Sequence, residues 1–215
     1  MKPILVLCDD KWHPAAVARS GLAALGNGEL SFDWIEDARD WSAQRMANYP
    51  LTLLVKANNV SSTDTTPWMT DHVQATFLDY VRRGNGLLAI HNGTAGYLDA
   101  GMLRGLLGGV FVRHPPQCPV TVEPRSGHPL TAGSAPFTLK DEHYFMALDD
   151  AEADLFLTTT SQYGTRAGGW TRNEGKGRVC VLTPGHNVEV WLHPAYQALI
   201  RNALRWCSEQ PTPHP

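Results

Sequence analysis

Two histidines and a glutamate stand at points of the chain where their side chains could move protons. His91 follows the apolar run "LLAI" and opens the turn "HNGTAG", and His186 follows "VCVLTPG". Glu142 lies in the polar cluster "KDEHY". Imidazole titrates near neutral pH, and an imidazole pair with a carboxylate can transfer protons or hold a divalent metal ion. We therefore predict a catalytic site made of His91, Glu142 and His186.

The same donors raise the question of a bound metal ion. If Zn²⁺ is present, we expect it on His91, His114, Glu142 and His186, because imidazole and carboxylate are zinc ligands. The sequence has no closely spaced HxH or HExxH motif, so we favour a metal-free acid/base site and keep Zn²⁺ as the alternative. Five histidines precede a proline, and for four of them hydrogen bonding within a turn is the expected role: His13, His128, His193 and His214, the fifth being His114.

The elements that position these residues follow from the apolar pattern. Short apolar runs at 4–8, 30–35, 51–57 and 87–90 predict strands, and the segments between them predict helices. The clearest helix begins with Thr66 as N-cap and Pro67 at its first position, and ends at Gly84. The first half is thus a βαβαβαβ run, which predicts an open parallel sheet with helices on both faces.

The second half differs in texture. Prolines and glycines are frequent after Gly109, and short β-rich pieces predict later strands and an insertion with antiparallel character, before a closing helix over 193–209. We predict a single α/β domain over 1–209, a three-layer sandwich with a mostly parallel central sheet, and a flexible tail over 210–215. Ligands of such sheets bind at the carboxyl ends of the strands, so His91 is expected to point into that crevice.

Composition excludes several classes of partner. The formal net charge is −3, and the longest basic cluster is the dipeptide Arg82-Arg83, so neither nucleic acid nor an anionic membrane is an expected partner. The apolar run 4–8 is too short for a signal peptide or a membrane span, which predicts a cytoplasmic protein. The four cysteines form no CxxC pair and fit buried thiols in a reducing compartment.

Four motifs together resemble one family. The segments "GLLAIHNGTAGY", "GGVFVRHPP", "HPLTAGSAPFTLKDEHYF" and "GKGRVCVLTPGHNVEVWLHPAYQALIRNALRW" are similar, in order and spacing, to the trehalose-utilisation (ThuA-like) family. The resemblance implies a flavodoxin-like fold related to class I glutamine amidotransferases. Those enzymes carry a nucleophilic cysteine on a strained turn, where this chain has His91. The resemblance therefore implies that glutaminase activity is absent, while His186 keeps the position of the general base.

Aromatic and polar residues complete the predicted site. The chain has seven tryptophans, and flat aromatic faces pack against the apolar side of sugar rings. Trp12 follows the first apolar run, and Trp170 lies in "AGGWTRNEGKG", which we interpret as a glycine-rich loop; core packing is the alternative for both. Side chains alternate along a strand, so at most one of His143 and Tyr144 faces the site. The predicted substrate-binding residues are Trp12, Asn92, His114, Tyr144 and Trp170.

The function implied by the resemblance is carbohydrate utilisation. We expect an enzyme of the isomerase, lyase or hydrolase type that acts by acid/base chemistry on a sugar or keto-sugar derived from trehalose or a related disaccharide. A sugar dehydrogenase of the same pathway is an expected partner, and a homodimer is the expected assembly. Two alternatives stay open: a non-catalytic sugar-binding or interaction module, and an amide or ester hydrolase with Cys8 or Thr94 as nucleophile.

Overall fold

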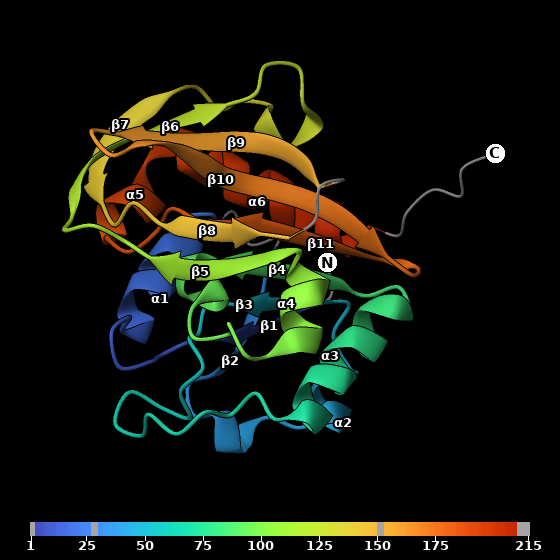
Figure 1. Cartoon of the computed structure of the whole chain (residues 1–215). Helices are drawn as coiled ribbons and strands as arrows, with labels where there is room; N and C mark the ends of the chain where they lie inside the picture. The colour runs from blue at the N-terminus through green and yellow to red at the C-terminus, as the bar shows by residue number, and fades with distance from the viewer. Residues whose placement is uncertain (1–2, 27–29, 150–152, 210–215) are drawn as a thin grey trace.

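A computed structural model describes residues 3–26, 30–149 and 153–209 (Figure 1). Its main sheet has nine strands in the order β2-β1-β3-β4-β11-β10-β9-β6-β7. Five of them are parallel, namely β1 (Ile4–Leu7), β2 (Phe32–Ile35), β3 (Leu51–Leu54), β4 (Gly86–Ile90) and β11 (Gly177–Leu182). The carboxyl ends of these five strands therefore meet along one edge of the sheet.

The inner parallel strands are apolar on both faces, and each face contributes to a separate core, whereas the edge strand β2 carries the half-exposed Asp33. In β1, Ile4 and Val6 pack into one core, while Leu5 and Leu7 pack into the other. Successive side chains of a strand point to opposite faces, so an uninterrupted apolar run fits a strand that is covered on both sides. This pattern explains why the first half of the sequence reads as a doubly covered parallel sheet.

Helices cover both faces of the sheet and make the protein a three-layer α/β sandwich, as predicted (Figure 1). The first core joins the sheet to α1 (Ala15–Ala23), α5 (Val188–Leu192) and α6 (Pro194–Ser208). The second core joins it to α2 (Ala43–Met46), α3 (Asp71–Arg82) and α4 (Gly101–Leu107). Among the described residues, no helix has the length and apolar character needed to cross a membrane.

Helix α3 begins four residues later than the sequence suggested. Its N-cap is Thr70, whose hydroxyl accepts a hydrogen bond from the Val73 amide at 3.4 Å. The predicted cap, Thr66, instead lies in a loop where its carbonyl accepts from the Val60 amide. A Thr-Pro pair looks like a helix start, but the Thr66 carbonyl bonds within the loop and the helix begins only after Thr70, so the prediction of a start at Thr66 is wrong.

The other half of the sheet is antiparallel. It consists of β10 (Gly164–Glu174), β9 (Asp154–Ser161), β6 (Cys118–Pro124) and β7 (Phe137–Asp141). A separate ribbon of β5 (Gly109–Arg113) and β8 (Phe145–Leu148) lies beside it. The antiparallel insertion was predicted, but strand β10 was not. Its segment 167–177 is rich in glycine and reads as a loop, whereas residues 169–174 pair with β11.

Candidate active site

The turn after β4 presents His91 on a strained backbone. His91 has φ of +48°, in the left-handed region that non-glycine residues seldom adopt, and it opens a short 3₁₀ turn, η2 (His91–Thr94). Gly93 permits this turn, because a Cβ there would lie 2.0 Å from the Leu54 carbonyl oxygen. The backbone thus forms a sharp elbow at the carboxyl end of a central strand, and the elbow carries an imidazole.

Hydrogen bonding fixes the orientation of the His91 ring. Nδ1 lies 2.8 Å from the carbonyl oxygen of Thr183, on the neighbouring strand end. A carbonyl oxygen only accepts, so Nδ1 carries the proton and Nε2 presents a lone pair. The side chain is fully buried, and Nε2 lies 3.4 Å from Oε2 of Glu142 without a well-directed hydrogen bond. In its neutral form His91 therefore turns the Nε2 lone pair toward Glu142, and in its protonated form the same nitrogen faces the carboxylate as an N–H group.

His186 stands on the turn after β11, and one carboxylate shapes that turn. Both oxygens of the buried Asp141 accept backbone N–H groups, from Gly185 at 2.8 Å, His186 at 3.0 Å and Asn187 at 3.2 Å. The His186 Nδ1 lies 3.2 Å from Oε2 of Glu142. That contact raises the pKa of His186, although burial opposes it. Asp141, at the end of the antiparallel strand β7, thus positions His186, which follows the parallel strand β11.

The turn after β1 adds a histidine that the sequence did not reveal. His13 Nδ1 lies 2.8 Å from Oδ1 of Asp10, and its Nε2 is buried without a hydrogen-bond partner among the described residues. Burial is the largest cause that lowers the pKa of His13. Its ring centroid lies 5.1 Å from that of His91 and 5.1 Å from that of His186. The interpretation of His13 as a turn histidine of structural value only is therefore incomplete.

Asp10 is the buried anion that holds this corner together. Besides His13, its carboxylate accepts from the Ala57 amide at 2.8 Å and from the Asn92 side-chain amide at 2.6 Å. Burial alone would raise the pKa of Asp10, but the contacts with His13, Ala57 and Asn92 lower it to about 2. Asp10 is therefore a charged carboxylate, and in this form it orients the His13 ring.

Glu142 enters from the connection between β7 and β8, and its carboxylate contacts His91 and His186. Burial would raise the pKa of its carboxyl, yet the contacts with His186 and His91 lower it. Because side chains alternate along this segment, the neighbouring His143 points the other way, with Nδ1 2.7 Å from Ser161 Oγ and Nε2 3.2 Å from the Thr159 carbonyl. His13, His91, Glu142 and His186 each offer a ligand atom, and these atoms all lie within 4.8 Å of one another.

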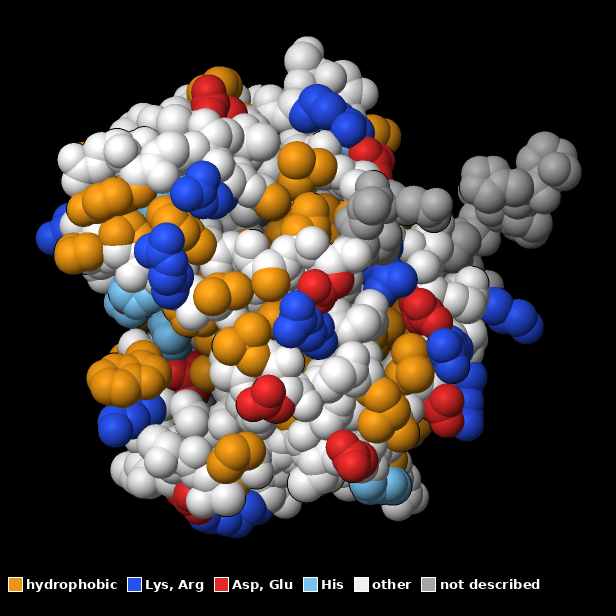
Figure 2. Space-filling model, viewed as in Figure 1, with side chains coloured by type: hydrophobic (Ala, Val, Ile, Leu, Met, Phe, Trp, Pro, Cys, Tyr) orange, Lys and Arg blue, Asp and Glu red, His pale blue; other side chains and the backbone are white. Residues whose placement is uncertain are grey.

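A cavity of about 710 Å³ opens directly beside this cluster. Tyr144 stacks on His91 with ring centroids 3.8 Å apart, and Trp12 stands at the rim with 66 % of its surface exposed. Figure 2 shows histidine side chains gathered on one flank of the molecule, beside acidic and hydrophobic side chains. Nine residues carry the polar and aromatic character of the lining: Trp12, His13, Asn58, Asn59, Phe111, His114, Glu142, Tyr144 and His186. Such a lining can bind a small ligand with both polar and flat apolar faces.

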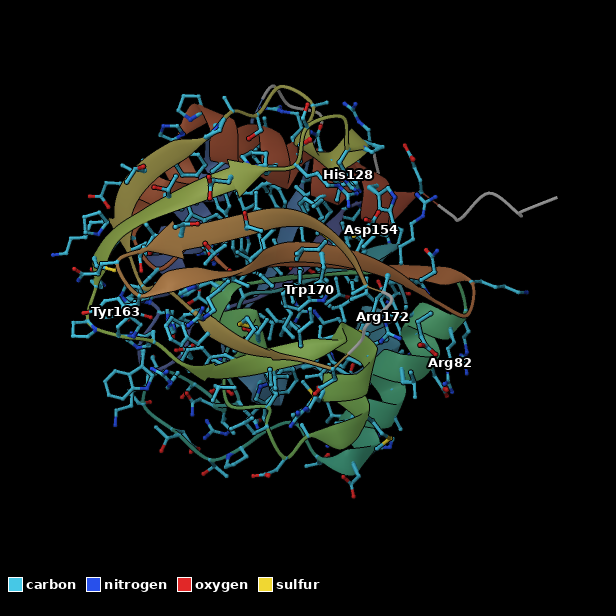
Figure 3. All side chains as sticks on the ribbon, turned by 45° about the horizontal axis from the view of Figure 1, so that its top comes forward. Arg82, His128, Asp154, Tyr163, Trp170 and Arg172 are labelled. Atoms are coloured by element: carbon cyan, nitrogen blue, oxygen red, sulfur yellow. The ribbon has the colours of Figure 1, made fainter. Side chains whose placement is uncertain are left out.

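Two residues predicted to bind substrate lie elsewhere. Trp170 is fully buried on β10, in the second core, and its indole N–H donates to the Leu107 carbonyl at 2.8 Å (Figure 3). The placement of Trp170 at a rim is therefore wrong, because its segment is a strand and not a loop. Asn92 is buried behind the cluster, where its amide donates to Asp10 and to the Val55 carbonyl, so it supports Asp10 and does not line the cavity.

His114 lies between the cluster and the cavity. Its Nδ1 is 2.8 Å from the Pro115 carbonyl, and its Nε2 is 3.6 Å from Oε1 of Glu142. It lines the cavity, as a substrate-binding residue should, but it is not one of the four residues whose ligand atoms converge. The predicted zinc set therefore changes at one position, with His13 in place of His114.

The remaining proline-flanked histidines match the structural interpretation where the structure describes them. His128 Nδ1 accepts from the Leu130 amide at 3.1 Å, and His193 Nδ1 accepts from the Ala195 amide at 3.3 Å, so both cap short helical starts. His214 lies outside the described residues.

Neither residue considered as an alternative nucleophile is available in the cavity. Cys8 is buried, and burial is the main cause that raises the pKa of its thiol to about 12. Thr94 is also buried, and its hydroxyl donates to the His91 carbonyl at 2.7 Å. A thiolate or alkoxide at either position would form too rarely to serve as nucleophile.

The sheet order, the elbow after β4 and the site at the carboxyl ends define a three-layer α/β protein, an architecture consistent with the class I glutamine amidotransferase-like fold. Within that class the chain belongs to the ThuA family, described as trehalose utilisation, whose family model matches residues 5–207. The comparison with curated proteins gives no match.

Solved structures share the fold at low sequence identity. A ThuA-like protein from Bacteroides uniformis is 18 % identical, with a TM-score of 0.73 over 95 % of this chain and 91 % of that one. A ThuA-like protein from Parabacteroides merdae is 17 % identical, with a TM-score of 0.74 over 96 % and 90 %. A cytoplasmic protein from Salmonella typhimurium is 14 % identical, with a TM-score of 0.70 over 96 % and 99 %. These similarities show a shared architecture.

Proposed function

We propose that this protein is an enzyme of carbohydrate utilisation that transfers protons next to a carbonyl of a sugar or keto-sugar. Family membership supports the carbohydrate-utilisation role. The observation that carries the catalytic part is the convergence of His91, Glu142 and His186 beside one cavity. A binding module needs shape and hydrogen bonds, but it has no need for one buried and two half-buried titratable groups held this close together, because removing such groups from water costs free energy.

The chemistry follows from the residue types. Enolisation, epimerisation and elimination next to a carbonyl each remove one proton and return one, and imidazole and carboxylate groups can do both when held within reach of the substrate. The cavity of about 710 Å³ has room for a monosaccharide or disaccharide unit. Tyr144 and Trp12 offer aromatic faces to a sugar ring, and His114 offers a hydrogen bond to a hydroxyl group.

A turnover screen tests this proposal. Purified protein is incubated with trehalose, related disaccharides and their keto derivatives, and products are followed by chromatography and by deuterium uptake from heavy water. We expect His91→Asn to fold normally and to lose turnover by about 100-fold or more, because it removes a group that acts in the cluster. If His91→Asn lowers stability by several kcal/mol while the folded fraction keeps full specific activity, His91 is a core residue and the proposed site is wrong.

Glutamine hydrolysis is the activity that this site should lack. His91 occupies the elbow, and Cys8 lies in the core. We expect no ammonia from glutamine; release that disappears in Cys8→Ala would contradict this assignment. The homodimer, the cytoplasmic location and the dehydrogenase partner stay proposals, with light scattering as the test of the first.

A further inference from the structure

The cluster of His13, His91, Glu142 and His186 contains more lone pairs than N–H groups to meet them. Among the described residues, the buried atoms Nε2 of His13, Nε2 of His91 and Nδ1 of His186 have no well-directed hydrogen bond, although the last two lie 3.4 Å and 3.2 Å from Oε2 of Glu142. Leaving a buried polar atom unsatisfied costs about 1–3 kcal/mol, and native proteins seldom do so without a reason. Three such atoms around one carboxylate indicate that a further group belongs among them.

The supporting contacts show which kind of group this is. Asp10 accepts from Nδ1 of His13, and the Thr183 carbonyl accepts from Nδ1 of His91. Both rings therefore hold their proton on Nδ1 and turn Nε2, as a lone pair, toward the cluster. Histidines that ligate metal ions characteristically donate their other ring N–H to a carboxylate or a backbone carbonyl, and these two partners are of those types.

We infer that His13, His91, Glu142 and His186 bind one divalent transition-metal ion, with zinc the ion that their nitrogen and oxygen atoms fit best. The inference deepens the proposed function and rests on it for the role of the ion. Three imidazoles with one carboxylate suit zinc and neighbouring transition metals, whereas magnesium and calcium prefer sites made of oxygen atoms alone.

The distances agree with this assignment. The four ligand atoms lie within 4.8 Å of one another. Bonds of about 2.0–2.1 Å to zinc place ligand atoms at most about 4.2 Å apart, so side-chain movements of less than about 1 Å complete the coordination. Glu142 lies between β7 and β8, outside both strands.

The position of the site gives the ion a role in the proposed reaction. Glu142 and His186 line the cavity, so an ion held by them can be reached by a ligand. An ion there would polarise a carbonyl or hydroxyl oxygen of a sugar and so acidify the neighbouring C–H bond. Tyr144 and His114 also line the cavity but do not belong to the four, and they stay free to contact the substrate.

Metal titration of the protein alone tests the inference without any substrate. Protein purified without an affinity tag is treated with a chelator, dialysed, and titrated with Zn²⁺ by calorimetry and with Co²⁺ by visible absorption. We expect one ion per chain. His13→Asn and Glu142→Gln should each weaken binding by about 10-fold or more, as ligand loss does. His72→Asn, which alters an exposed histidine on α3, is the matched control and should bind normally.

Circular dichroism of each variant shows whether weaker metal binding comes from a missing ligand or from unfolding. If one of the two variants unfolds, metal binding by the other tests the inference. The inference is overturned if neither ion binds at one per chain, or if a folded His13→Asn binds as tightly as the unaltered protein. Saturable binding without any sugar turnover supports the inference and removes the proposed function. Turnover that persists in protein shown to hold no metal supports the proposed function and overturns the role of the ion in it.

Discussion

Two cavities of nearly equal volume lie at opposite ends of the sheet and differ in how their histidines are satisfied. The cavity beside the cluster, about 710 Å³, lies at the carboxyl ends of the parallel strands. The second, about 730 Å³, lies toward their amino ends and is lined by 125–130 and 171–173. In the second, His128 Nε2 meets Asp154 at 3.1 Å and Arg125 pairs with the same carboxylate at 2.7 Å (Figure 3).

The two cavities have similar volumes, but their histidines differ in hydrogen bonding. His128 uses both ring nitrogens within the protein, since Nδ1 accepts from Leu130 and Nε2 meets Asp154. His13 and His91 use one nitrogen each and leave the other toward the cluster. A histidine with both nitrogens bonded is structural, whereas one with a supported ring and an open nitrogen is available to a ligand. Counting hydrogen-bond partners therefore distinguishes the two cavities, although their sizes do not.

The largest expected effect comes from neutralising the carboxylate of Glu142, and the same change at Asp154 in the second cavity is its control. Glu142→Gln keeps the size of the side chain and removes its charge, so we expect turnover of a sugar substrate to fall by about 100-fold or more. Asp154→Asn makes the same change in the second cavity and should leave kcat/KM unaltered, because its partners only hold one another. Steady-state kinetics of both variants check the pair. Equal losses in the two variants would erase the distinction between the cavities.

A smaller effect is expected from Asp10→Asn, which acts through His13. Asp10 is a positioning residue, and an amide there disturbs the tautomer and the orientation of the imidazole. We expect Zn²⁺ affinity to fall by about 10- to 100-fold, the usual effect of losing such a partner. Competition with a chromophoric chelator measures it, and Asp149→Asn, an exposed carboxylate paired with Arg104, is the control. Unchanged affinity in the folded Asp10→Asn protein would remove this role.

The smallest effect sharpens the comparison at the rim. Trp12 is two-thirds exposed, so Trp12→Ala should change stability by no more than about 0.5 kcal/mol. We expect KM for the sugar to rise several-fold with kcat preserved, because the ring contributes binding that is equal in ground and transition states. Tyr163→Ala removes an exposed aromatic ring far along the chain and should alter neither constant. A fall in kcat alone would argue against a rim contact.

Much of the fold could be predicted from local sequence. The inner parallel strands are apolar on both faces, and the runs at 4–8, 51–57 and 87–90 carry this signal without help from distant residues. Strand β10 was missed because the pair Gly168-Gly169 is typical of a loop. They serve instead at a crowded position, where a Cβ on Gly168 would lie 2.9 Å from the Thr158 backbone. Strand propensity counts a glycine against a strand, but it does not include the close backbone contact that requires a glycine at this position.

The candidate site could be predicted in part, and His13 shows the limit. His91 and His186 follow apolar strands, so their positions were readable from the chain. His13 lies six residues beyond the end of β1, and it approaches His91 because the turn folds back onto Asp10. A His-Pro pair gives no sign of this return. The one local clue was the doublet Asp9-Asp10, since a buried carboxylate at a strand end requires a partner.

Asp141 has a consequence for motion. Its single carboxylate accepts the amides of Gly185, His186 and Asn187, and the next residue along the chain is Glu142. The three amides can then lose protection only when the end of β7 separates from the turn after β11. In hydrogen exchange they should behave as one cooperative unit, with a common opening free energy. Any opening that exposes them also draws Glu142 from His91 and His186, so the site assembles only when the two halves of the sheet are docked.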